Sequence, residues 1–295
     1  MKRSVIIVAV ILLSVFAAIS IRKSTRDMAV PETAEDSGLS AERKAEIRRF
    51  WDVHRRATYL MRQGSWEGAT AAYQEALAID PRHEDALYYL GNMFFELERY
   101  EEAVTTWRRL IEVNPISARA YLQLGAVYSC GAQGAPFDLE AAEREFQRAL
   151  AINKEETGPI IKLGEVNLLS GRREQALTYF TTAVQSNSKS VEAHYLIGYL
   201  EWRRGDRDAA LQALRQAAEL SRPKQKPAGE PLGEGDTRGG GPMLTEGASR
   251  RSFFALHWMA LKTWEHTEVS ERQMDDEYKG LDHQLSLLLE EGRVK

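Results

Sequence analysis

Six histidines are the side chains of this sequence best suited to acid–base or metal chemistry, at positions 54, 83, 194, 257, 266 and 283. No two of them are four residues apart, so no pair shares a helix face as zinc ligands do in an HExxH motif. The sequence also lacks the GxSxG turn that exposes a nucleophilic serine. We therefore expect no enzyme activity, no catalytic residue and no metal site.

Cysteine chemistry and phosphate binding have no better support. Cys130 is the single cysteine, so it can form neither an internal disulfide nor a multi-cysteine metal site, and a small buried side chain is its expected role. The glycine-rich residues 233–241 (GEGDTRGGG) lack the Gly-Lys-Ser/Thr sequence of a phosphate-binding loop. We expect no cofactor and no small-molecule substrate.

The charged residues are arranged as in a folded, solvated protein. The 295 residues are 43% hydrophobic and 28% charged, with a net charge of −4, which favours a folded body over a disordered one. No excess of basic residues suggests nucleic acid. Acidic runs such as Glu101-Glu102 and Asp275-Asp276-Glu277 are expected to face solvent, where charged side chains are the usual filling.

The first residues have the character of a membrane anchor. Residues 4–21 (SVIIVAVILLSVFAAISI) carry no charge, and a helix of this length spans roughly 27 Å, close to the thickness of the hydrocarbon core. A cleaved signal peptide is the alternative, because Lys2 and Arg3 precede the apolar run and residues 18–20 could form a cleavage site. Basic residues from Arg22 onward favour an uncleaved anchor.

The anchor predicts where the rest of the chain lies. We interpret residues 1–26 as a single-pass signal anchor and residues 27–42, which are polar and contain proline, as a flexible tether. The body is then expected on the extracytoplasmic or periplasmic side. A body secreted after cleavage, or a cytoplasmic body, are the alternatives, because the basic residues on the two sides of the apolar run nearly balance.

The body is an internal repeat. Blocks start at Phe50, Glu84, Ala118, Thr157 and Val191, with three steps of 34 residues and one of 39. Column eight of each block holds a small residue: Ala57, Gly91, Gly125, Gly164 and Gly198. Column twenty, after removal of five inserted residues from the third block, holds Ala69, Ala103, Ala142, Ala176 and Ala210. Column twenty-four holds Tyr73, Trp107, Phe146, Phe180 and Leu214. This period indicates a helical repeat.

The columns are those of two antiparallel helices. Small residues at columns eight and twenty let the helices approach, and the large residue at column twenty-four fills the space between a pair and its neighbours. Column fifteen holds Gly64, Gly171 and Gly205, where a left-handed residue would end the first helix. Asp80-Pro81 and its counterparts at the block ends are expected to start the next helix as N-cap and first helical residue.

These columns closely resemble the tetratricopeptide repeat, over residues 50–224. The resemblance implies an all-α, right-handed solenoid of about five helix pairs within residues 43–224. The apolar residues described above place one transmembrane helix before it. The repeats lie near residues 50–83, 84–117, 118–156, 157–190 and 191–224. The first block departs from the family at Arg56 and Ala57, and the third has an insertion at residues 130–138, which predicts a longer loop.

The resemblance also implies a concave groove lined by columns 2, 5, 9, 12 and 13 of the first helices. Such a surface, rich in aromatic residues, is typical of protein binding, so we expect a protein or peptide partner and no nucleic acid. The chaperone-tail clamp of some family members is not expected, because only Asn92 matches its five positions. The predicted groove residues are Trp51, His54, Asp85, Tyr88, Asn92, Phe95, Arg119, Leu122, Ile161, Glu165, Leu168, Glu192, Tyr195, Tyr199, Trp202 and Arg203.

The C-terminal residues are expected to form a linker and two helices. Residues 225–248 are rich in Gly and Pro, which predicts a linker or long loop. Residues 249–295 show apolar side chains at helical spacing, and solenoid ends need a cap, so capping is the expected role. Two alternatives stay open, namely that the groove aromatics pack against this segment, or that residues 253–264 meet a membrane or partner. The apolar positions are Phe253, Leu256, Ala260, Trp264, Tyr278, Leu281, Leu285 and Leu288.

The sequence therefore predicts a membrane-tethered scaffold that recruits a partner protein to its groove. A periplasmic biogenesis factor or chaperone, of the cytochrome-maturation or outer-membrane-assembly type, is the alternative. One stoichiometric partner would indicate the scaffold, and many unstructured clients bound weakly would indicate the chaperone.

Overall fold

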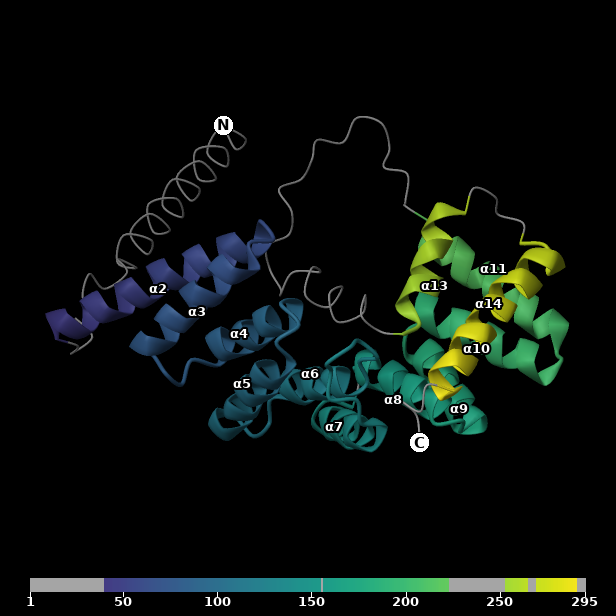
Figure 1. Cartoon of the computed structure of the whole chain (residues 1–295), viewed down its shortest axis with the longest axis horizontal. Helices are drawn as coiled ribbons and strands as arrows, with labels where there is room; N and C mark the ends of the chain where they lie inside the picture. The colour runs from purple at the N-terminus through teal and green to yellow at the C-terminus, as the bar shows by residue number, and fades with distance from the viewer. Residues whose placement is uncertain (1–39, 155, 223–252, 265–268, 291–295) are drawn as a thin grey trace, which may run out of the picture. The chain divides into compact units, whose positions relative to one another are not determined.

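The computed structural model describes residues 40–154, 156–222, 253–264 and 269–290. These residues form twelve α-helices and one short 3-10 helix, with no strand among them (Figure 1). The chain divides into two compact units, residues 1–49 and 50–295. In the first unit the described part is the beginning of helix α2, where Ser40 Oγ accepts a hydrogen bond from the Arg43 amide.

The predicted anchor lies outside the described residues, as do the linker at 225–248 and most of the tether. No helix in the part that the structure describes has both the length and the apolar character needed to cross a bilayer. The anchor therefore stays a prediction.

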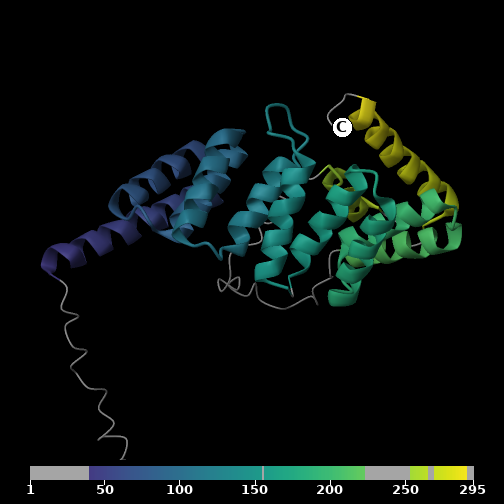
Figure 2. The same ribbon diagram turned by 90° about the horizontal axis from the view of Figure 1, so that it is seen from below.

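Five antiparallel helix pairs follow one another along the chain, and the second helix of each pair packs against the first helix of the next (Figure 2). The pairs are α2 (Ala41–Arg62) with α3 (Trp66–Ile79), α4 (Glu84–Glu96) with α5 (Tyr100–Val113), α6 (Ala118–Tyr128) with α7 (Leu139–Ile152), α8 (Thr157–Leu169) with α9 (Arg173–Ser186), and α10 (Val191–Arg204) with α11 (Arg207–Ser221). Three further elements follow: α13 (Ala255–Ala260), the 3-10 helix η1 (Leu261–Thr263) and α14 (Glu271–Glu290). The all-helical repeat array is as predicted; its right-handed sense stays a prediction.

Each pair closes around the residues of columns eight and twenty-four. A Cβ atom added to Gly91 would lie 2.3 Å from the Trp107 ring, and one on Gly164 would lie 2.5 Å from Phe180. Gly125 has the same relation to Phe146 in the third pair. These aromatic rings are completely buried. Glycine is therefore required at column eight of the second, third and fourth pairs, because the aromatic side chain of the second helix occupies the place of a Cβ.

The turns inside the pairs follow the prediction at column fifteen. Gly64, Gly171 and Gly205 have φ angles of +73°, +74° and +89°, the left-handed conformation that glycine adopts at least cost. The second pair has Glu98 at this column, with φ of +61°. In the third pair residues 129–138, which contain the insertion, form the longer loop between α6 and α7.

The turns between the pairs correct the prediction for Asp80-Pro81. Asp80 ends α3 as its C-cap, and α4 starts three residues beyond Pro81, with His83 as N-cap. The Asp80 carboxylate accepts a hydrogen bond from the Arg82 amide, and Asn114 makes the equivalent bond to Ile116. The Asp or Asn side chain thus stabilises the turn after the preceding helix. Asp and Asn favour turns as well as helix N-caps.

Candidate protein-binding face

The first-helix face consists of the side chains at columns 2, 5, 9, 12 and 13 of α2, α4, α6, α8 and α10. The structure buries part of it and leaves Trp51 45% exposed. We divide it into an open region on α2, α4 and α6, a central region on α8, and a covered region on α10. The buried members of the predicted groove are Asn92, Phe95, Ile161, Glu165, Leu168, Tyr195 and Tyr199.

The open region centres on Tyr88, which is half-buried. The Arg119 guanidinium lies over the Tyr88 ring, 4.7 Å from its centroid, and also pairs with Asp85. Gln123 donates a hydrogen bond from its side-chain amide to the Tyr88 hydroxyl oxygen at 3.2 Å. Tyr88 and Arg119 are therefore held in place by neighbours from two successive repeats. Leu122, the next predicted residue, is also half-buried and packs against a small core cluster around Phe146.

An aromatic cluster lies at the start of the open region. The Trp51 ring meets His54 and His83 edge to face, with centroids 5.5 and 5.6 Å apart. Burial, followed by the neighbouring His83, lowers the pKa of His54 below its ordinary value. His54 is consequently neutral near pH 7, and this part of the face presents aromatic surface with little charge.

Three ionisable side chains with little exposure to solvent meet at the central region. Lys162 Nζ donates to Glu165 at 2.7 Å and to Glu192, on the next first helix, at 3.2 Å. Burial raises the pKa of Glu165 to about 8, against the attraction of Lys162. The two carboxylates outweigh burial at Lys162 and raise the pKa of its ammonium. The pKa of Glu192 is lowered, since Lys162 and Glu165 more than offset its burial. Lys162 thus bonds both carboxylates, and because Glu192 belongs to α10, these hydrogen bonds connect the fourth repeat to the fifth.

The covered region lies beneath α14 (Figures 1 and 2), and four of its predicted groove residues donate hydrogen bonds to that helix, namely Tyr195, Tyr199, Trp202 and Arg203. Tyr195 donates to Glu277 at 2.6 Å and Trp202 to Asp275 at 2.8 Å. Tyr199 and Arg203 both donate to Asp282, at 2.8 and 2.7 Å. Burial and the Asp282 carboxylate raise the pKa of Tyr199, which keeps its hydroxyl protonated as a donor.

Tyr278 of α14 occupies the space above Gly198. A Cβ added to Gly198 would lie 2.2 Å from the Tyr278 hydroxyl oxygen. Tyr278 is completely buried and donates to the Tyr195 carbonyl at 3.1 Å. In the second, third and fourth repeats the aromatic side chain of column twenty-four fills the equivalent space. At column twenty-four the fifth repeat has Leu214, which has no ring. Helix α14 thus supplies the ring that the fifth repeat lacks.

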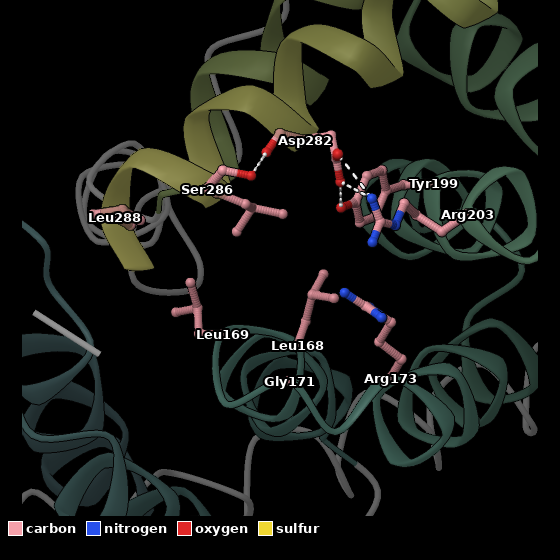
Figure 3. A pocket seen from close by; sticks show the side chains of 10 residues that line it. Leu168, Leu169, Gly171, Arg173, Tyr199, Arg203, Asp282, Ser286 and Leu288 are labelled. Carbon is pink, nitrogen blue, oxygen red and sulfur yellow. Dashed lines mark hydrogen bonds and ion pairs between the residues drawn. The ribbon is translucent and has the colours of Figure 1, made fainter. Parts of the chain in front are cut away.

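The ends of α8 and α14 enclose a small pocket beside these contacts (Figure 3). Asp282, hydrogen-bonded to Tyr199 and Arg203, closes one side, and the Arg173 side chain reaches in from the start of α9. The apolar wall of the pocket consists of Leu168, Leu169, Leu285 and Leu288. The α14 helix therefore meets the fourth repeat as well as the fifth.

The other C-terminal elements pack on the last helix pair, α13 on α10 and η1 on α11. Phe254 and Leu261 are buried in the same core cluster as the fifth repeat, and η1 lies against α11. Arg215 of α11 donates two hydrogen bonds to the Val269 carbonyl, at 3.0 and 3.1 Å. The C-terminal segment therefore covers the last repeat and also occupies part of the first-helix face.

The structure corrects the prediction for two acidic residues. From the sequence, Asp275 and Glu277 are expected to face solvent, but in the structure both accept hydrogen bonds from the first-helix face. The signal that could have indicated this contact is the spacing of Tyr278, Leu281 and Leu285, which places an apolar stripe beside the carboxylates. Within the described residues, no three His, Cys, Asp or Glu side chains gather closely enough to hold a metal ion.

Two family models match the chain. The model for the cilia and flagella-associated protein 70 middle TPR-like domain matches residues 42–142. A tetratricopeptide-repeat model matches residues 162–225. The first match includes the inserted loop and ends in α7, and the second begins within α8, so together they cover most of the five helix pairs.

Curated relatives have similar sequences over about half of this chain. Superkiller complex protein 3 of Mus musculus is 28% identical over 150 residues, which are 46% of this chain and 9% of that protein. Anaphase-promoting complex subunit 3 of Schizosaccharomyces pombe is 28% identical over 148 residues, 50% of this chain and 22% of that protein. The chain thus spans less than a quarter of the length of these relatives.

The solved structure of PilW, described as a widely conserved type IV pilus biogenesis factor, has the same fold. It superimposes with a TM-score of 0.51 at 19% identity, over 58% of this chain and 77% of that one. At this identity the likeness concerns the fold alone.

Proposed function

We propose that this chain is a protein-interaction scaffold of the tetratricopeptide-repeat type, which binds a partner protein on the open region of its first-helix face. The observation that carries the proposal is that Trp51 is exposed on the same first-helix face as half-buried Tyr88 and Arg119. Trp, Tyr and Arg are the residue types that dominate binding energy at protein interfaces.

The rigidity of this region supports the proposal. Tyr88 is fixed by Gln123 and Arg119, and Arg119 is fixed by Asp85. Side chains that are already ordered lose little conformational entropy when a partner binds. Both curated relatives named above are, by their names, members of multiprotein complexes, which agrees with a scaffold.

The membrane tether belongs to the same proposal. The uncharged residues 4–21 would hold the scaffold at a membrane, with its body on the extracytoplasmic side, and so raise its effective concentration for partners there. Protease treatment of intact spheroplasts tests this. Digestion of the body would support the extracytoplasmic orientation, and protection in intact spheroplasts with digestion after lysis would place the body in the cytoplasm.

Affinity capture after crosslinking in the membrane tests the binding face. The variant Trp51→Ala/Tyr88→Ala/Arg119→Ala should lose a protein that the unchanged chain captures, with the same helical content by circular dichroism. The control is Ile116→Ala, which removes a 73% exposed apolar side chain from the turn between α5 and α6. Equal capture by the triple variant would refute the proposed face. Weak capture of many unfolded proteins would indicate a biogenesis factor or chaperone instead.

A further inference from the structure

Helix α14 shows what kind of segment the first-helix face accepts. It presents Met274, Tyr278 and Leu281, all completely buried. Carboxylates flank this stripe and accept hydrogen bonds from Tyr, Trp and Arg side chains of α10. Its twenty residues include six acidic and two basic side chains, a net charge of −4. The occupant is therefore an acidic amphipathic helix with a central aromatic residue.

The covered region receives this helix with uncharged or positive donors. Tyr195 and Tyr199 donate through hydroxyl groups, Trp202 through its indole nitrogen, and Arg203 through its guanidinium. Arg207, at the start of α11, adds two hydrogen bonds to Asp275 at 3.0 Å. Aromatic side chains with N–H or O–H groups thus bury the apolar stripe and bond the carboxylates beside it.

The open region has the same combination of groups. Tyr88 stands at column five, as Tyr195 does, and accepts from Gln123, so its own hydroxyl proton remains to donate. The Trp51 side chain is 45% exposed. Arg119 has five N–H groups and uses only part of them on Asp85. These donors border half-buried aromatic surface, the arrangement that α10 offers to α14.

We propose that the partner segment bound by the open region is an acidic amphipathic helix of the α14 type, with an aromatic residue flanked by carboxylates. This inference rests on the proposed function and names the chemistry of its partner. The carboxylates meet Arg119, Trp51 and Tyr88, and the aromatic side chain packs on the rings between them.

A labelled peptide with the sequence of residues 269–290 tests the proposal against the purified full chain in detergent. We expect one peptide to bind per chain, with the chain's own α14 still in place. Arg119→Ala and Tyr88→Phe should each weaken binding by roughly ten- to a hundredfold, since each removes a hydrogen bond to a charged group. The matched control, Ile116→Ala, should bind as the unchanged chain does.

A second peptide isolates the role of charge. The substitutions Asp275→Asn, Glu277→Gln and Asp282→Asn keep its shape and remove three charges, so binding should fall by tenfold or more at low salt. Equal binding of the two peptides would overturn the proposal. It would also be overturned if Tyr195→Phe weakened binding while Tyr88→Phe did not, because the peptide would then have displaced α14.

Competition with the captured partner separates this inference from the proposed function. The acidic peptide should release a partner that is bound through Trp51, Tyr88 and Arg119. A partner that depends on these residues but resists the peptide would leave the proposed function standing and refute the helix chemistry. Absence of any partner that depends on them would refute the proposed function itself.

Discussion

The two ends of the first-helix face have similar side chains and opposite accessibility. At the covered region, Tyr195 and Tyr199 are buried beneath α14, whereas Trp51 at the open region is 45% exposed. Both ends combine aromatic rings with an arginine. Residue type at these columns therefore does not decide whether the face is free; the chain's own C-terminal helix does.

The cause of this difference lies in one column of the repeat. Trp107, Phe146 and Phe180 fill the space beside their glycines from within their own repeats. Leu214 has no ring for the equivalent space over Gly198, and Tyr278 fills it from α14. An incomplete repeat thus creates the site that binds the terminal helix.

The largest effect should follow from removal of this ring. We expect Tyr278→Ala to destabilise the fifth repeat and the C-terminal helices by about 3–5 kcal/mol, as removal of a buried aromatic side chain usually does. Urea unfolding measures the loss, and hydrogen exchange should show faster exchange in α10 and α14 than in α4. Tyr59→Ala, at a 63% exposed ring, is the control. A loss below about 1 kcal/mol would mean that Tyr278 is not the residue that holds α14.

Between the two ends, Glu165→Gln should change how stability depends on pH. Burial raises the pKa of Glu165 from 4.5 to about 8, so between these values the folded chain keeps a proton that the unfolded chain releases. The free energy of unfolding therefore falls as pH rises through this window, by at most about 1.4 kcal/mol per pH unit. The glutamine variant should lose this decrease.

Urea unfolding of both chains at several pH values from 5 to 8 measures the difference. The pKa shifts of Lys162 and Glu192 do not affect stability between pH 5 and 8, because the pKa of Lys162 is raised from 10.5 and that of Glu192 is lowered from 4.5. The two chains differ at this one residue, so the difference between their curves reports on Glu165. Parallel curves would show that Glu165 ionises normally in the folded state.

A smaller effect should distinguish two glycines, Gly198 in α10 and Gly280 in α14. Gly198→Ala should cost about 1–3 kcal/mol, because its Cβ would overlap the Tyr278 hydroxyl. Gly280→Ala, in α14, meets no atom within 4 Å and should stabilise by roughly 0.5–1 kcal/mol through helix propensity. Thermal unfolding of the two variants gives both signs. Equal effects at the two positions would contradict the close contact between α10 and α14.

The smallest effect lies at the other end of the array. Glu98 holds a left-handed conformation where other repeats have glycine, so Glu98→Gly should stabilise by roughly 0.5–1 kcal/mol. Glu96→Gly, at the last residue of α4, should not stabilise and serves as the control. Thermal unfolding distinguishes them, and a lower melting temperature for Glu98→Gly would show that the glutamate side chain has a compensating contact.

The sequence predicts the array well because its columns report contacts that recur inside every repeat. Gly91 with Trp107, and Gly171 at its turn, follow from spacing alone. The N-cap assignment at Asp80-Pro81 was wrong because Asp also favours a turn after a helix end. Local pattern does not separate the two positions.

The position of α14 could not be predicted in the same way. Asp275 and Glu277 bond residues more than seventy positions earlier in the chain, and an acidic run also suits a solvent-facing helix. The sequence leaves packing of the groove aromatics against the C-terminal segment as an open alternative, and the missing ring at Leu214 is the feature that points to one particular contact. The contact itself becomes evident only in the structure, where the Tyr278 side chain lies over Gly198.

The space over Gly198 also limits how the array can change in length. Stacking another helix pair onto the fifth would need the surfaces of α10 and α11 that α14 and η1 cover. Gene duplication at the C-terminal end would have to displace the terminal helix or copy it as well, whereas duplication among the second to fourth pairs would leave it undisturbed. We expect longer and shorter homologues to differ inside the array, and to inherit the last pair and its terminal helix as one unit.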